Sequence, residues 1–223
     1  MTNNLVKVKK SGIEWIDTIP VHWDVLPLFA VFRERQAPNI GNKEANLLSL
    51  SYGKIIRKNI ATNFWLLPES FDTYNIVEPG DLVLRLTDLQ NDKRSLRCGL
   101  VYERGIVTSA YLSLEILEPK RLNPAYAYYL LHSYDLKKVF YSMGGGVRQS
   151  IKFDDLKRLP IILPPLKEQL EIASLLDSQT ADIDSQIKRN EKEIDLLKEY
   201  RNSRVFEIAS GKASIQMRES NAS

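Results

Sequence analysis

"PIILPPLKEQLEIASLLDSQTADID" (Pro160–Asp184) joins two stretches of very different composition. Short apolar runs separated by turn residues precede it, whereas no proline or glycine occurs between Pro165 and Gly211. Pro165 suits the first turn of a helix, because its missing N–H has no intrahelical partner there. Glu168 and Glu171 suit the positive end of the helix dipole. The stretch therefore predicts that a folded domain ends here and that one long helix begins.

Positions spaced alternately four and three residues apart follow along this helix: Leu176, Thr180, Ile183, Ile187, Asn190, Ile194, Leu197 and Arg201. This spacing is typical of a coiled-coil seam, in which a polar member such as Asn190 fixes register and partner number. Asp184 with Lys188 and Arg189 with Glu193 are charge pairs four residues apart. A helix of about 65 Å is too long to be covered by one domain, so we expect it to pair with another helix, such as one from a second copy. The alternative is a helix folded back on its own core.

Size and composition allow one sizeable domain with an appendage, or two small domains, in 223 residues. The N-terminus has no apolar signal region, and no apolar run approaches the roughly 20 residues of a membrane span. The single cysteine, Cys98, excludes an internal disulfide framework and suits a reducing cytoplasm. Residues 1–163 carry 22 Lys and Arg against 17 Asp and Glu, whereas residues 164–223 carry 9 against 11. This asymmetry favours a polyanion as partner of the first part and a protein as partner of the second.

The sequence before the long helix predicts a fold that contains both helices and strands. Apolar and aromatic residues in "SGIEWIDTIPVHW" predict an N-terminal arm anchored by its tryptophans, and "VEPGD" (Val77–Asp81) predicts a turn followed by a strand. Asn123 and Pro124 predict the capped start of a helix to Met143, interrupted around Ser133–Asp135. Further helices are expected at Leu26–Gln36 and Phe153–Leu159, and short strands at "NLLSLSYGKII", "YNIV", "DLVLRL", "CGLVY" and "SAYLSLEIL".

Catalytic motifs are not evident in the sequence. The two histidines, His22 and His132, lie at no metal-ligand spacing, and Cys98 has no nucleophile context. "ASGKAS" lacks the first glycine of a phosphate loop. Leucines flank the Pro164-Pro165 pair, where a DNA amino-methyltransferase needs a hydrogen-bonding residue and an aromatic one. We therefore expect a non-catalytic chain without a bound metal or cofactor.

Cations and hydrogen-bonding side chains concentrate in three stretches of the basic part: "SYGKIIRKN" (Ser51–Asn59), "LRLTDLQNDKRSLRCG" (Leu84–Gly99) and "GGGVRQSIK" (Gly144–Lys152). DNA reading needs cations for phosphates and polar side chains on rigid turns for base edges. The alternative for each stretch is a solvated loop. The candidate DNA contacts are Tyr52, Lys54, Arg57, Lys58, Arg85, Thr87, Gln90, Lys93, Arg94, Arg97, Arg148, Gln149, Ser150 and Lys152.

Several of these segments together resemble the specificity subunit of type I restriction-modification systems. "SGIEWIDTIPVHW" resembles its N-terminal signature, and "GGGVRQSIKFDDLKRLPIILPPLKEQLEIASLLDSQTADIDSQI" resembles the glycine-rich loop that leads through L-P-P-L into its long helix. "LKEYRNSRVFEIASGK" resembles the end of that helix. "SLSYGKIIRK", "EPGDLVLRLTDLQNDKRSLR" and "GIVTSAYLSL" are similar to one type of target recognition domain.

The resemblance implies an α+β fold, with a target recognition domain at 1–163, a spacer helix at 164–210 that pairs as an antiparallel coiled coil, and a tail at 211–223. It implies a non-catalytic subunit that reads one half of a bipartite double-stranded DNA target and docks modification subunits. Those subunits would methylate adenine N6 with S-adenosylmethionine, and a restriction subunit would use ATP and Mg. The expected location is the cytoplasm, with no membrane partner.

One departure from the family is the single recognition domain and single helix, where typical members carry two of each. The chain then corresponds to a half-subunit, a truncated product or a cut fragment, and a half-unit should self-associate through its helix. Two other classes stay open. One is a coiled-coil interaction protein with a basic ligand-binding domain, and the other is a fragment of a fused methyltransferase or nuclease.

Overall fold

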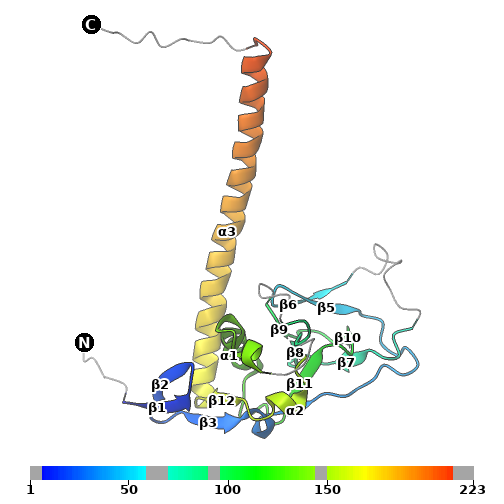
Figure 1. Cartoon of the computed structure of the whole chain (residues 1–223), viewed down its shortest axis with the longest axis vertical. Helices are drawn as coiled ribbons and strands as arrows, with labels where there is room; N and C mark the ends of the chain where they lie inside the picture. Colours follow the sequence, from blue (N-terminus) through cyan, green and yellow to red (C-terminus); the bar gives the residue numbers. More distant parts are fainter. Residues whose placement is uncertain (1–6, 59–69, 90–95, 144–149, 213–223) are drawn as a thin grey trace. The chain divides into compact units, whose positions relative to one another are not determined.

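The computed structural model of the chain describes residues 7–58, 70–89, 96–143 and 150–212. Contacts between residues divide the chain into two units, Met1–Ser174 and Leu175–Ser223, and the boundary falls inside one helix. Short strands and helices make up the first unit, and the long helix continues into the second (Figure 1). The α+β class with a long C-terminal helix, predicted from the sequence, is confirmed.

The largest sheet is antiparallel and has four strands in the order β4–β11–β8–β9. Its strands are β4 (Phe32–Glu34), β11 (Leu112–Ile116), β8 (Leu82–Leu84) and β9 (Cys98–Leu100). β8 follows the predicted turn, in which Gly80 adopts a φ of 96°. Every residue of β8 and β9 is buried, so these strands need apolar side chains on both faces rather than an alternating pattern.

The described residues also form four separate two-stranded antiparallel sheets. They are β1 (Val8–Ile13) with β2 (Ile16–Pro20), β3 (Asp24–Pro27) with β12 (Pro160–Leu163), β5 (Leu48–Ser51) with β6 (Lys54–Arg57), and β7 (Asn75–Val77) with β10 (Gly105–Val107). The β3–β12 pair places Leu26 opposite Ile161. It therefore ties the N-terminal arm to the segment that leads into the long helix.

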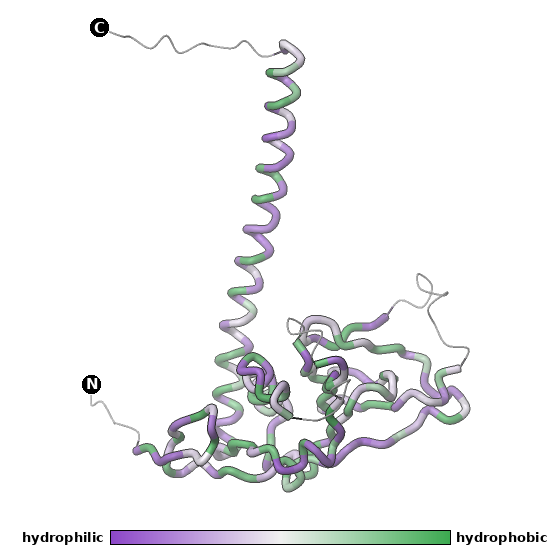
Figure 2. The backbone as a smooth tube through the Cα atoms, in the orientation of Figure 1, coloured by the Kyte–Doolittle hydropathy of each residue, from purple (hydrophilic) through white to green (hydrophobic). Residues whose placement is uncertain are grey.

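The N-terminal arm is anchored by apolar side chains, as predicted. Ile13 and Ile19 are buried together with Ile162 of β12, and Trp15 and Trp23 are partly buried against them. Figure 2 shows hydrophobic residues recurring along the strands of this region.

Helix α1 (Pro124–Leu136) begins as the sequence predicts. The Asn123 side chain accepts a hydrogen bond from the Tyr126 N–H at 3.0 Å, and Pro124 occupies the first turn. The expected interruption at Ser133–Asp135 is wrong by a few residues, because the helix continues to Leu136. Lys137 caps its end, and Lys138, whose φ is 60°, leads into a 3₁₀ turn, η3 (Val139–Ser142).

The helix expected at Leu26–Gln36 is also wrong. The structure has the end of β3, a 3₁₀ turn η1 (Leu28–Ala30) and strand β4 there. Phe32 pairs with Ile116 of β11, so the sheet ladder satisfies the backbone that a helix would otherwise have satisfied internally. The predicted helix at Phe153–Leu159 is present in shorter form as α2 (Phe153–Leu156).

Helix α3 is continuous from Leu166 to Ala209 and has 44 residues. In the first unit its start is fixed by Gln169, which is fully buried and whose amide donates to the carbonyls of Arg121 (2.9 Å) and Pro164 (2.8 Å). Glu168 accepts from the Trp23 indole at 2.8 Å and lies 2.7 Å from His22 Nε2. These bonds lower the pKa of Glu168.

Within the second unit, four apolar members of the predicted seam, Ile183, Ile187, Ile194 and Leu197, are exposed by about half, from 48% at Ile187 to 58% at Leu197, whereas Leu176 is partly buried. Figure 2 shows hydrophobic and hydrophilic residues recurring along this helix. No helix among the described residues is long and apolar enough to cross a membrane.

Candidate nucleic-acid interface

The first predicted stretch forms the hairpin β5–β6, whose two-residue turn is Tyr52-Gly53. Their φ values of 46° and 77° are those of the mirror-image turns that match the twist of paired strands. Tyr52 is exposed at this tip with Lys54 exposed beside it, and Lys58 is exposed at the other end of the hairpin, just after β6.

The hairpin tip is anchored to the rest of the first unit. The Tyr128 hydroxyl of α1 donates to the Gly53 carbonyl at 3.2 Å. A side chain at Gly53 would meet Leu96 Cβ at 3.2 Å, so the glycine permits the close approach of these two segments. Leu96 belongs to the second predicted stretch, and the structure therefore brings the first two stretches into contact.

Arg57 is exposed on β6 and pairs with Glu103. Its Nε donates to Glu103 Oε1 at 2.6 Å, and its Nη2 donates to the other carboxylate oxygen. The pairing raises the pKa of the Arg57 guanidinium and lowers the pKa of the Glu103 carboxyl. Arg57 can exchange this carboxylate for a phosphate, because both groups accept the same two-pronged donor.

Arg97 does not lie at the surface, and its assignment as a DNA contact is wrong. The residue is 0% exposed, and its Nη1 donates to the carbonyls of Arg85 (3.0 Å) and Thr87 (2.8 Å). Its Nε donates to the Tyr141 hydroxyl at 3.0 Å, and its Nη2 lies 3.4 Å from the Asp88 carbonyl. A buried guanidinium must have its donors satisfied inside the protein, and here they hold the backbone of Arg85–Asp88.

A buried carboxyl group adjoins this arginine. Asp135 of α1 accepts the Arg97 backbone N–H through Oδ2 at 2.6 Å, and its Oδ1 is buried with no hydrogen-bond partner among the described residues. Burial raises the pKa of Asp135 and lowers the pKa of the neighbouring His132. Burial also raises the pKa of the Cys98 thiol, the next residue after Arg97. These groups support the fold beneath the surface residues.

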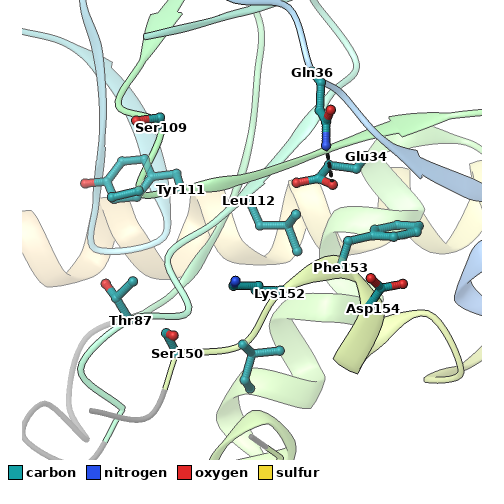
Figure 3. Close-up of a pocket in the computed structure, with 12 residues that line it drawn as sticks. Glu34, Gln36, Thr87, Ser109, Tyr111, Leu112, Ser150, Lys152, Phe153 and Asp154 are labelled. Atoms are coloured by element: carbon teal, nitrogen blue, oxygen red, sulfur yellow. Dashed lines mark hydrogen bonds between the residues drawn. The ribbon is translucent and has the colours of Figure 1, made fainter. Parts of the chain in front are cut away.

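The third predicted stretch meets the second through the backbone. The Ile151 N–H donates to the Leu86 carbonyl at 3.0 Å. The residues on either side of this bond, Thr87, Ser150 and Lys152, line one hollow of about 530 Å³. Figure 3 shows Thr87 and Ser150 close to each other, with Lys152 between them and Phe153.

The hollow also contains residues that the sequence did not single out. They are Glu34, Gln36, Ser109, Ala110, Tyr111, Leu112, Ile151, Phe153 and Asp154. Gln36 and Glu34 come from the end of β4, and Figure 3 shows the Gln36 amide pointing to the Glu34 carboxylate, to which it donates at 2.9 Å. Neither residue lies in any of the three stretches selected from the sequence, because Leu26–Gln36 was predicted to be a helix.

Both signs of charge occur in the hollow. Lys152 is cationic, whereas Glu34 and Asp154 are anionic, and Asp154 pairs with Lys157 at 2.9 Å. A phosphate site needs an excess of cations. This set of hydroxyl, amide, carboxylate and ammonium groups instead offers donors and acceptors of the kind that recognise base edges.

The five remaining candidates, Gln90, Lys93, Arg94, Arg148 and Gln149, lie outside the described residues. Arg85 is half-buried, and its backbone N–H donates to the Arg97 carbonyl at 2.8 Å. We call the buried Arg97 guanidinium and the backbone carbonyls that it binds the Arg97 clamp. Within the described part of the chain, no group of three or more His, Cys, Asp or Glu side chains could hold a metal ion.

Comparison with models of known protein families shows which family this chain is related to. The type I restriction modification DNA specificity domain matches residues 99–195, from β9 into α3. The chain belongs to the type I specificity family. The predicted resemblance is therefore confirmed.

A curated relative of this specificity chain is the putative type I restriction enzyme MjaX specificity subunit of Methanocaldococcus jannaschii. The two are 36% identical over 191 residues, which make up 83% of this chain and 42% of that protein. The chain thus spans less than half the length of this relative.

A solved structure shares the fold. A chain from work on complex assembly and conformational transition of the type I R-M system superposes with a TM-score of 0.61 and 16% identity, over 90% of this specificity chain and 48% of that chain. The HsdS subunit from Thermoanaerobacter tengcongensis superposes less closely, with a TM-score of 0.49 and 16% identity, over 80% and 41% of the two chains.

Proposed function

We propose that this chain is a DNA-reading specificity subunit, which recognises one half of a bipartite double-stranded target. The observation that carries the proposal is the convergence of the three polar stretches in one unit. Gly53 lies close to Leu96, and the Ile151 N–H bonds to the Leu86 carbonyl, so the second stretch meets both the first, 43 positions away, and the third, 65 positions away. Family membership alone would not say which surface meets the DNA.

This surface would make two kinds of contact with DNA, one with phosphates and one with bases. The exposed hairpin cations Lys54, Arg57 and Lys58 would neutralise phosphates, which fixes register without reading sequence. The mixed polar hollow and the hairpin tip would face the bases, where donors and acceptors discriminate.

The chain would serve a catalytic assembly without performing chemistry itself. Modification subunits would transfer the methyl group of S-adenosylmethionine to adenine N6, and a restriction subunit would use ATP and Mg. The support for this division is the family relationship together with the sequence, in which we found no catalytic motif.

The second unit would join two copies of the chain. Ile183, Ile187, Ile194 and Leu197 lie along the predicted seam and are each about half exposed. Burial of such a stripe against an antiparallel partner helix would remove apolar surface from water. The dimer would present two recognition units to a two-fold symmetric bipartite site.

DNA binding by the full chain, assembled with its modification subunits, tests the first part of the proposal. Affinity for a random-sequence duplex should fall steeply with salt, with a logarithmic slope of about 0.9 for each phosphate contact. A Lys54→Ala, Lys58→Ala double variant should lower that slope by about 2 and leave the sequence preference unchanged. A salt-independent affinity would contradict DNA reading and favour a scaffold that binds another ligand.

Light scattering tests the helix pairing separately. The full chain should be dimeric at micromolar concentration, and Asn190→Leu should change the number or register of paired helices without changing DNA affinity. The matched control is Glu191→Leu, one residue off the seam. A chain that is monomeric at this concentration would refute pairing through α3.

A further inference from the structure

We propose that the β5–β6 hairpin enters the DNA major groove as a two-stranded ribbon and that the Tyr52 ring contacts a base there. The inference rests on the proposed DNA-reading function and names the residue that reads. Tyr52 would act through its ring, whereas its lysine neighbours would act through charge.

The backbone at Tyr52 is in a conformation that its side chain disfavours. Among the described residues, only Asn42, Tyr52, Asp88 and Lys138 combine a side chain with a positive φ. Asn and Asp tolerate this region because their short polar side chains bond locally. An aromatic residue gains no such local bond, so Tyr52 is a strained choice for the turn.

Burial does not offset this strain. Tyr52 is 82% exposed. Lys138, the other unusual residue, differs because its ammonium lies over the Tyr141 ring at 4.8 Å from the centroid. The folded chain therefore gains little from having a ring at position 52.

Tertiary structure fixes the turn whatever the side chain at position 52 is. Ser51 pairs with Lys54 and Leu50 with Ile55, and Leu50 is buried. The Tyr128 hydroxyl holds the Gly53 carbonyl. Asn-Gly is the favoured pair in such a turn, because both residues adopt a positive φ without strain. The ring is thus held out on a rigid support that does not need it, which is how a binding side chain is pre-organised.

The dimensions of the hairpin select the major groove. Paired strands lie about 4.8 Å apart, and the major groove is about 12 Å wide, enough for a two-stranded ribbon, whereas the minor groove is about 6 Å wide. Lys54, at the start of the outgoing strand β6, and Lys58, just after its end, are exposed and would meet phosphates as the tip enters. The Tyr52 ring would then make apolar contact with a base edge, such as a thymine methyl group, while its hydroxyl could hydrogen-bond.

The test measures both the thermal midpoint of unfolding and the affinity for DNA. It uses the full chain assembled with its modification subunits. The probes are the duplex selected by the wild-type complex from a random library, its single-base-pair variants, and a non-selected duplex. Tyr52→Asn should raise the thermal midpoint of the chain by about 1–3 °C, because asparagine suits the turn. It should weaken binding to the selected duplex by about ten- to a hundredfold, and binding to the non-selected duplex by less than threefold.

Two control variants test whether the ring at position 52 itself reads a base. Tyr52→Phe keeps the ring and should retain most of the discrimination. Tyr102→Asn removes a comparably exposed ring, 74% exposed, and should leave discrimination unchanged. Loss of discrimination at one base pair in Tyr52→Asn alone supports the contact.

Three outcomes would overturn the inference. One is full discrimination in Tyr52→Asn, and another is a lowered thermal midpoint in that variant, which would make the ring structural. The third is equal loss in Tyr102→Asn, which would make the effect nonspecific. If the wild-type complex selects no sequence at all, the proposed DNA-reading function itself fails, and this inference with it.

Discussion

The β5–β6 hairpin and the segment from Leu84 to Gly99 both carry arginine and lysine, yet the structure places Arg57 and Arg97 very differently. Arg57 of the hairpin has a side chain 72% exposed and pairs with a carboxylate at the surface. Arg97 of the second segment is 0% exposed and binds backbone carbonyls in the interior. A cation in a basic stretch is therefore evidence of DNA contact only when the surrounding strands leave it at the surface.

The comparison also separates two tasks in recognition. The hairpin presents side chains outward, whereas the Arg97 clamp shapes the backbone from which Thr87 is presented. Together with the Ile151–Leu86 bond, the clamp leaves no carbonyl from Arg85 to Asp88 without a hydrogen-bond contact. A rigid support of this kind is what base reading requires.

Removal of Arg97 should have the largest effect. Arg97→Met leaves buried carbonyls and the Tyr141 hydroxyl without their donor, and we expect the free energy of unfolding to fall by about 3–5 kcal/mol. Chemical denaturation of the full chain measures this loss. Arg57→Met is the matched control and should leave the unfolding midpoint nearly unchanged, because its side chain is exposed. Equal losses in the two variants would remove the distinction between the two regions.

Crowding the contact between the hairpin and β9 should reduce stability by an intermediate amount. A Cβ at Gly99 would lie 2.6 Å from Leu50 Cδ1 and 2.9 Å from Ile55 Cδ1, both on the hairpin. Gly99→Ala should therefore cost about 1–3 kcal/mol through overpacking. Adding Ile55→Val removes one of the crowded methyl groups and should restore part of the loss, as a double-mutant cycle would show. Strictly additive effects would mean that the hairpin does not pack on β9 in solution.

The smallest effect is a difference in pH dependence between two carboxyl groups. Burial raises the pKa of Asp135 beside Arg97, so its contribution to stability is complete at low pH and is lost as pH rises through the folded pKa. Arg57 lowers the pKa of Glu103, whose contribution is present at neutral pH and is lost as pH falls through the folded pKa. Asp135→Asn should therefore gain stability relative to the wild type as pH rises from about 4 to about 7.

Glu103→Gln should show the opposite trend over the acidic range. Unfolding free energies of both variants, measured by denaturation at a series of pH values, test the pair together. A common direction of change would show that the two carboxyl groups do not experience opposite environments.

Local chemistry made several elements predictable. The cap at Asn123 and the turn at Gly80 each depend on a few neighbouring residues, and both are present. Strand structure is also present in "NLLSLSYGKII", where a turn at Tyr52-Gly53 divides it into β5 and β6. Strand β12 was not predicted, because its pairing with β3 joins residues more than 130 positions apart. The same reason explains the wrong helix at Leu26–Gln36, where pairing with β11 overrode a helical spacing.

The candidate interface was predictable only in part. Tyr52, Lys54, Arg57 and Lys58 are exposed on one hairpin, and Thr87, Ser150 and Lys152 line one hollow. No local pattern indicated that Gln36 and Tyr111 would join that hollow, since each lies in a segment whose composition is that of an ordinary helix or strand.

The amino-acid sequence by itself determined the long helix Leu166–Ala209, because a stretch free of proline and glycine with a regular apolar spacing favours helix wherever it lies. It also determined the turns and the helix cap, which depend on backbone preferences of single residues. Only the tertiary structure decided that Arg97 is buried and that Tyr52 is held outward on a strained turn. Burial depends on which distant segments pack together, and no local pattern specifies that choice.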